Sequence, residues 1–98
     1  MSVETKPALI NSIRNKLESL FQQNNNSVLI LHNDDFIYYL NVINGLKNVL
    51  NYSQLEAYNT TMKVHYNKQA VVFNGSKGEL EQYKKELYDN YGLTTTIE

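Results

Sequence analysis

The feature that most constrains this chain is a short apolar run that ends abruptly in hydrogen-bonding side chains. Val28–Leu31 is followed directly by His32-Asn33-Asp34-Asp35. A run of apolar residues that stops at turn-forming residues is typical of a buried strand, and Asn and Asp side chains accept hydrogen bonds from the free N–H groups at a helix start. We therefore expect a strand over 28–32, with polar groups collected where it leaves the core.

Two helices are predicted after this strand. From Phe36 to Leu50 the apolar residues recur at helical spacing, and Asn51 should end that helix. Ser53-Gln54-Leu55-Glu56 is a capping-box pattern, so a second helix should begin there. The apolar residues that continue along this second helix are Leu55, Tyr58 and Met62, with Val64 or His65.

The last third of the chain is predicted to form a strand, a helix and a strand. Residues 69–73 are a short strand, and Asn74-Gly75 favours a tight turn after it. Ser76 should begin a helix that Gly92 closes, and 93–97 alternate as a final strand. Because the sheet needs cover, we expect an α+β fold of order β-α-α-β-α-β, with three helices on one face of a three-stranded antiparallel sheet.

The first quarter of the chain is interpreted as an appendage. Its apolar residues from Pro7 to Phe21 recur at three- and four-residue intervals and predict an amphipathic helix, and the polar tract that follows is typical of a linker. We therefore divide the chain into an N-terminal helical extension with an Asn-rich linker, 1–26, and a core domain, 27–98. The sequence leaves open whether the extension packs on the core, dimerises or binds a partner; we expect a monomer.

Composition argues against several classes of function. The chain has 98 residues, no cysteine, and 9 basic against 10 acidic residues, which argues against disulfides, thiol chemistry and a nucleic-acid partner. No apolar run approaches the roughly 20 residues of a membrane span, and the N-terminus lacks the apolar segment of a signal peptide. We therefore expect a cytoplasmic protein that needs no cofactor and contacts no membrane.

Three segments, in this order and spacing, resemble the ClpS family of adaptors for Clp proteases. They are His32-Asn33-Asp34-Asp35 followed by an aromatic residue, then Val64-His65-Tyr66-Asn67, and then Gly92-Leu93 through Ile97-Glu98. The resemblance covers about Ser27 to Glu98. It implies an adaptor and not an enzyme. Such an adaptor binds the free N-terminus of proteins that begin with Leu, Phe, Tyr or Trp (an N-degron), and it docks on the N-domain of a Clp AAA+ ATPase.

The resemblance also implies which residues bind the substrate. Asn33, Asp35 and His65 would hold the α-amine, with Asp34 supporting the loop. A carboxamide oxygen, a carboxylate and a neutral imidazole are three acceptors, and they match the three donors of an –NH₃⁺ group. The first side chain of the substrate would enter an apolar pocket formed by Leu31, Tyr39, Val42, Thr61, Val64 and Leu93.

The chain departs from the family pattern at several of these positions. Ile37 stands where a threonine is usual, Tyr39 where a methionine is common, and Thr61 where the pocket usually has methionine or another apolar residue. Lys68 replaces a usual glycine. The substitutions at Tyr39 and Thr61 change pocket volume and wall polarity together, so they bear on which first residues the chain prefers.

Other interpretations remain open. A Glu and a Lys commonly used for ATPase docking fall at Gly78 and Tyr83, so the chain is alternatively a ClpS-like modulator of a Clp ATPase that no longer binds N-degrons. From the residues alone, 33–35 is alternatively only a helix cap. The least favoured alternative is a small metal-dependent enzyme, whose candidate ligands would be His32, Asp34, Asp35 and His65.

Overall fold

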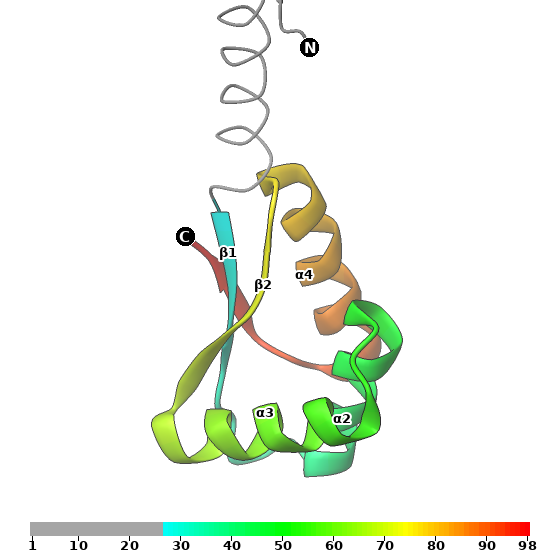
Figure 1. Cartoon of the computed structure of the whole chain (residues 1–98), viewed down its shortest axis with the longest axis vertical. Coiled ribbons are helices and arrows are strands. Elements are labelled where there is room, and N and C mark those ends of the chain that lie inside the picture. Colours follow the sequence, from blue (N-terminus) through cyan, green and yellow to red (C-terminus); the bar gives the residue numbers. More distant parts are fainter. Residues whose placement is uncertain (1–26) are drawn as a thin grey trace, which may run out of the picture.

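The computed structural model describes residues 27–98, in which three strands and three helices follow one another in the order β-α-α-β-α-β (Figure 1). This is the predicted order. The N-terminal helix and linker predicted for 1–26 lie outside the described residues. The bounds of the elements are β1 Ser27–His32, α2 Tyr39–Leu50, α3 Gln54–Asn67, β2 Gln69–Gly75, α4 Lys77–Tyr91 and β3 Thr95–Ile97.

Strand β1 is the centre of the sheet, and both of its neighbours run antiparallel to it. The strand order is β2-β1-β3, and Leu31 pairs with Ala70 on one side and with Thr95 on the other. The register with β2 shifts between Leu29 and Ile30, where Val72 is the additional residue. The central position explains the apolar run in the sequence, because a middle strand has no edge in contact with water.

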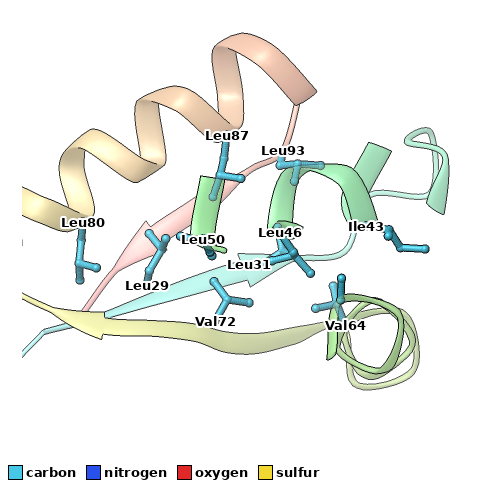
Figure 2. Packing of buried hydrophobic residues seen from close by; sticks show 11 residues of the cluster. Leu29, Leu31, Ile43, Leu46, Leu50, Val64, Val72, Leu80, Leu87 and Leu93 are labelled. Carbon is cyan, nitrogen blue, oxygen red and sulfur yellow. The ribbon is translucent and has the colours of Figure 1, made fainter. Parts of the chain in front are cut away.

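The core lies between the sheet and the helices, and Figure 2 shows side chains from β1, β2, α2, α3 and α4 converging there. Helix α4 contacts all three strands, whereas α2 packs between α3 and α4. Helix α3 contacts β2 and lies across the end of the sheet (Figure 1). The three helices expected on one face therefore do not cover the sheet equally. The site described below lies at the end of the sheet that α3 crosses. The largest fully buried side chains are Leu29, Leu31, Leu46, Leu80 and Leu87.

Most of the predicted helix ends are confirmed by their capping geometry. Ser53 and Glu56 form a reciprocal capping box at the start of α3, and the Ser76 hydroxyl accepts a hydrogen bond from the Glu79 N–H at the start of α4. Asn51 and Gly92 close α2 and α4 in the left-handed conformation, with φ of 62° and 71°. These caps fix the short connections between the helices.

The predicted start of the first helix was wrong, and the second helix leaves much of its apolar pattern exposed. Helix α2 begins at Tyr39 and not at Phe36, whose side chain is 94% exposed in the preceding turn. In α3 the apolar residues Leu55 and Tyr58 are 69% and 49% exposed. The residues that α3 buries against its neighbours are Ala57, Thr61 and Val64. Small side chains on this side allow α3 to lie close to α2 and β2.

The prediction of a turn at Asn74-Gly75 was also wrong. Strand β2 continues through Gly75, because Asn74 and Gly75 pair with Val28 and Ser27 at the start of β1. Gly75 does not adopt a positive φ. The last strand is shorter than predicted: it covers Thr95–Ile97, and Leu93 is buried in the connection before it. No helix within residues 27–98 has the length and apolar character needed to cross a membrane.

Candidate functional site

The polar turn after β1 is held by backbone hydrogen bonds and by one carboxylate. The Asn33 N–H donates to the Lys68 carbonyl oxygen at 2.9 Å, which joins the turn to the end of α3. The Asp34 Oδ1 accepts from the Phe36 N–H at 2.9 Å, and the Asp34 carbonyl accepts from the Ile37 N–H at 3.1 Å. Asp34 therefore shapes the turn.

Asn33 and Asp35 form a side-chain pair on this turn. The Asn33 Nδ2 donates to the Asp35 Oδ1 at 2.9 Å, and the pair is exposed to solvent. Because the amide nitrogen faces Asp35, the carboxamide oxygen of Asn33 faces elsewhere. The pair thus presents an amide oxygen and an anionic carboxylate as neighbouring acceptors. Such acceptors can form charge-assisted hydrogen bonds with a cationic donor.

An apolar cavity opens beside this pair. Its empty volume is about 360 Å³, solvent at the mouth included. Asn33 and Asp34 lie at its polar side together with His32, and Asp35 and His65 are not part of its lining. The six residues predicted to form a pocket all line it: Leu31, Tyr39, Val42, Thr61, Val64 and Leu93. One concave site therefore collects residues from β1, α2, α3 and the connection before β3.

The hydroxyl of Thr61 does not make the cavity wall as polar as the sequence implied. Thr61 is 2% exposed, and its Oγ1 donates to the Ala57 carbonyl oxygen at 2.7 Å, one turn earlier in α3. A threonine hydroxyl that is bound to its own helix has used its donor. The Thr61 hydroxyl therefore already donates within α3.

His65 is half-buried and lies between two tyrosine rings. Its ring centroid is 5.4 Å from that of Tyr39 and 5.0 Å from that of Tyr66, both in edge-to-face geometry. Within residues 27–98 no hydrogen bond or ion pair joins His65 to Asn33 or Asp35. The structure therefore brings Asn33 and Asp35 into contact, and it connects His65 to the cavity through Tyr39.

His32, the other histidine, contacts β3 and was a candidate ligand of the metal-dependent alternative. The His32 Nε2 is 2.7 Å from the Thr96 Oγ1 on β3, so this ring is engaged across the sheet. Among the described residues, no three His, Asp or Glu side chains are grouped in a way that could hold a metal ion. The ligand set of the metal-dependent alternative is thus not assembled in this part of the chain.

Sequence reasoning missed three residues that line the cavity, His32, Ile37 and Thr94. Ile37 had been noted only as a departure from the family pattern. No pattern in the sequence marked it: Ile37 is half-buried in the turn before α2, between Phe36 and Tyr38, which are both exposed.

Gly78 and Tyr83, the two positions on α4 linked to ATPase docking, differ in their surroundings. A Cβ added at Gly78 would meet no atom within 4 Å, so this position is open to solvent. The Tyr83 ring packs edge-to-face on Phe73 with centroids 4.9 Å apart, and its hydroxyl donates to the Glu79 Oε2 at 3.3 Å. Burial and the Glu79 carboxylate raise the pKa of Tyr83 above its usual value. Tyr83 therefore serves the packing of α4 on β2.

Comparison with known proteins identifies the family. The sequence model of the family described as ATP-dependent Clp protease adaptor protein ClpS matches residues 22–96. The chain therefore belongs to the ClpS family, whose members are adaptors of Clp proteases and not enzymes.

One solved structure supports the same assignment. It is described as the structure of Agrobacterium tumefaciens ClpS2 bound to L-phenylalaninamide. It is 27% identical to this chain with a TM-score of 0.69, and the match covers 74% of this chain and 93% of ClpS2. Among curated proteins, no match was found.

Proposed function

We propose that this ClpS-family adaptor binds the free N-terminus of proteins whose first residue is Leu, Phe, Tyr or Trp. The observation that carries the proposal is that Asn33, which binds Asp35, lies at the polar side of a cavity lined by all six predicted pocket residues. A site that joins an anionic acceptor to an apolar cavity matches a ligand that joins a cation to an apolar side chain. The first residue of a protein with a free α-amine is such a ligand.

The amine would be held by acceptors from two elements. Asp35 supplies the countercharge and the Asn33 carboxamide oxygen a second acceptor. His65 supplies a third acceptor when its imidazole is neutral, reached by the amine or through a bridging water. Each hydrogen bond to a charged group contributes about 1.5–3 kcal/mol. An internal peptide segment lacks the amine and would lose this contribution.

The first side chain would enter the cavity. Burying a Leu or Phe side chain contributes about 1.5–3 kcal/mol, and association itself costs several kcal/mol in lost freedom of motion. Neither the amine contacts nor the apolar contacts are therefore sufficient alone. A substrate must have both a free amine and a bulky first side chain, which is the basis of the expected specificity.

The remaining steps would be carried out by the partner. The adaptor makes and breaks no bond; it holds the substrate while docked on the N-domain of a Clp ATPase, which unfolds it for the protease. In this proposal the core domain, 27–98, provides the substrate site, and 1–26 form an N-terminal extension. Gly78 and Tyr83 stand where the family commonly has the Glu and the Lys used for docking. Because both charged side chains are absent here, we expect the contact with the ATPase to use other residues of α4 or its surroundings.

The proposal is tested by following backbone and side-chain NMR signals of the full chain while L-phenylalaninamide is added. The expected shifts lie on Leu31, Val42, Val64, Leu93 and the Asn33 side-chain amide. N-acetyl-L-phenylalaninamide is the matched control, because it keeps the ring and loses the charged amine. Equal shifts with both compounds, or shifts confined to other surfaces, would contradict the proposed amine site.

A further inference from the structure

Helix α3 carries a second apolar face that the described residues leave largely exposed. Leu55 and Tyr66 are 69% and 75% exposed, Tyr58 is 49% exposed, and Met62 is half-buried. These four residues, the outer stripe of α3, follow one another at three- and four-residue spacing and so lie on one side of the helix. Three of the four carry the apolar spacing that predicts the helix. In the structure they face away from Ala57, Thr61 and Val64, the side that α3 buries.

The outer stripe adjoins the proposed substrate site. Tyr58 precedes Thr61 of the cavity wall by three residues, and Met62 precedes His65 by three, so each pair is adjacent on the helix surface. The Tyr66 ring is in contact with His65, and His65 is in contact with Tyr39, which lines the cavity. A continuous surface therefore leads from the cavity, past His65, to the outer side of α3.

The chemistry of the outer stripe indicates what it accommodates. None of the four residues is charged, and the one basic side chain beside them is Lys63, which lies three residues before Tyr66 and borders the stripe. From Leu55 to Tyr66 the helix rises about 16 Å, which is the length of roughly five residues of extended peptide. The surface thus fits a short, uncharged and apolar stretch of extended chain.

We propose that the outer stripe of α3 binds apolar side chains of the substrate a few residues after its N-terminus, at about the third to sixth positions. The inference rests on the proposed function, since the first residue must occupy the cavity for the following chain to reach α3. It extends substrate choice from the first residue to the segment that follows. Proteins with an apolar segment next to a bulky first residue are then the preferred substrates.

The test compares two fluorescent peptides that share Phe at position 1 and Ser at position 2. One has Leu at positions 3–6 and the other has Ser there. We expect the apolar peptide to bind the full chain about five- to tenfold more tightly, because partial burial of one or two Leu side chains has that effect. The Leu55→Ser, Tyr58→Ser double variant should reduce this difference to less than about twofold while keeping the affinity for the Ser peptide.

The matched control is Tyr88→Ser on α4, where the tyrosine is likewise exposed, at 65%. This variant should keep the full difference between the two peptides, and thermal melting should show that both variants remain folded. Equal binding of the two peptides by the native chain would overturn the inference while leaving the proposed function intact. If neither peptide binds, the proposed function fails and the inference with it.

A self-association measurement tests whether a second copy of the chain occupies the outer stripe instead. If sedimentation shows a concentration-dependent dimer of the native chain that the double variant abolishes, the stripe is an interface between two copies. That result would also overturn the inference.

Discussion

Asn33 donates a 2.9 Å side-chain hydrogen bond to Asp35, so the proposed amine site is ordered by its own members. The pair is exposed and makes little contact with the core, and its removal should therefore affect binding far more than folding. Asp35→Asn keeps the shape and an acceptor oxygen for Asn33 but loses the negative charge. We expect affinity for a free N-terminal Phe peptide to fall about 10- to 100-fold.

Titration calorimetry measures this loss, and thermal melting of the same variant should show a nearly unchanged midpoint. Asp89→Asn removes an exposed carboxylate from α4, where it pairs with Lys85, and serves as the charge-matched control. Unchanged affinity in Asp35→Asn would show that the carboxylate has no part in binding.

A second prediction concerns Gly45 in α2. A Cβ at this position would lie 2.9 Å from the Leu93 Cδ1 and 3.3 Å from atoms of Leu87 and Tyr91. Alanine improves helix propensity by up to about 1 kcal/mol, but crowding in a packed core costs about 1–3 kcal/mol. We expect Gly45→Ala to lower the free energy of unfolding, and to weaken peptide binding as well because Leu93 lines the cavity.

Urea unfolding measures the stability effect, and Gly78→Ala provides the comparison. No atom lies within 4 Å of a Cβ at Gly78, so alanine there should raise the stability of α4 by about 0.5–1 kcal/mol. Equal stabilisation by Gly45→Ala and Gly78→Ala would contradict the close packing of α2 on Leu93.

Lys68 has a strained backbone conformation and is hydrogen-bonded to the turn that carries the proposed amine site. It adopts a φ of 75° at the end of α3, in the left-handed region, and its carbonyl oxygen accepts from the Asn33 N–H. A side chain in this conformation costs about 1 kcal/mol or more, which glycine avoids. Lys68→Gly should therefore raise the free energy of unfolding by about 0.5–1 kcal/mol.

Chemical denaturation of Lys68→Gly beside Lys63→Gly tests this explanation. Lys63 lies inside α3, where glycine costs about 1 kcal/mol, so the two variants should shift stability in opposite directions. A loss of stability in both would mean that Lys68 makes a favourable contact that outweighs its conformation.

The acid sensitivity of α3 follows from its capping box. The Glu56 carboxylate accepts from the Ser53 N–H at 2.9 Å, and this bond, with that of the Ser53 side chain, lowers the pKa of Glu56 below its ordinary 4.5. A folded-state pKa that is lowered contributes stability above the unfolded value, and that stability disappears as the pH falls through the folded-state pKa. The native chain should therefore lose stability relative to Glu56→Gln as the pH is lowered below 4.5.

Thermal melts of both proteins between neutral and strongly acidic pH provide the comparison. The difference between the two midpoints should be constant at neutral pH and should shrink below pH 4.5, the ordinary value for Glu. A difference that is independent of pH would show that the Glu56 charge does not support the cap.

The order of elements could be predicted because local signals were strong. The apolar run before Asn33, the Ser53 capping box and Gly92 each specify a backbone feature within a few residues, and all three are confirmed. The predicted pocket residues came from family resemblance, and the fold brings them into one cavity because β1, α2 and α3 meet at the end of the sheet.

The failures share a physical cause, which is that periodicity identifies a face without saying what covers it. Leu55 and Tyr58 lie at helical spacing, yet α3 buries its small residues instead, since only these allow close approach of α2 and β2. Asn74 and Gly75 are common turn residues, but pairing with β1 extends the strand through them. In each case a tertiary contact, invisible in the local sequence, decided the outcome.

The central claim is that a charged N-terminal amine and a bulky first side chain are recognised together. The most direct measurement is fluorescence anisotropy with one peptide that begins with Phe, beside the same peptide N-acetylated and one that begins with Ala. We predict micromolar or tighter binding of the free Phe peptide and at least about a tenfold loss in both controls. Equal binding of the acetylated peptide, or no binding with any bulky first residue, would contradict the claim and favour a ClpS-like modulator that has lost N-degron binding.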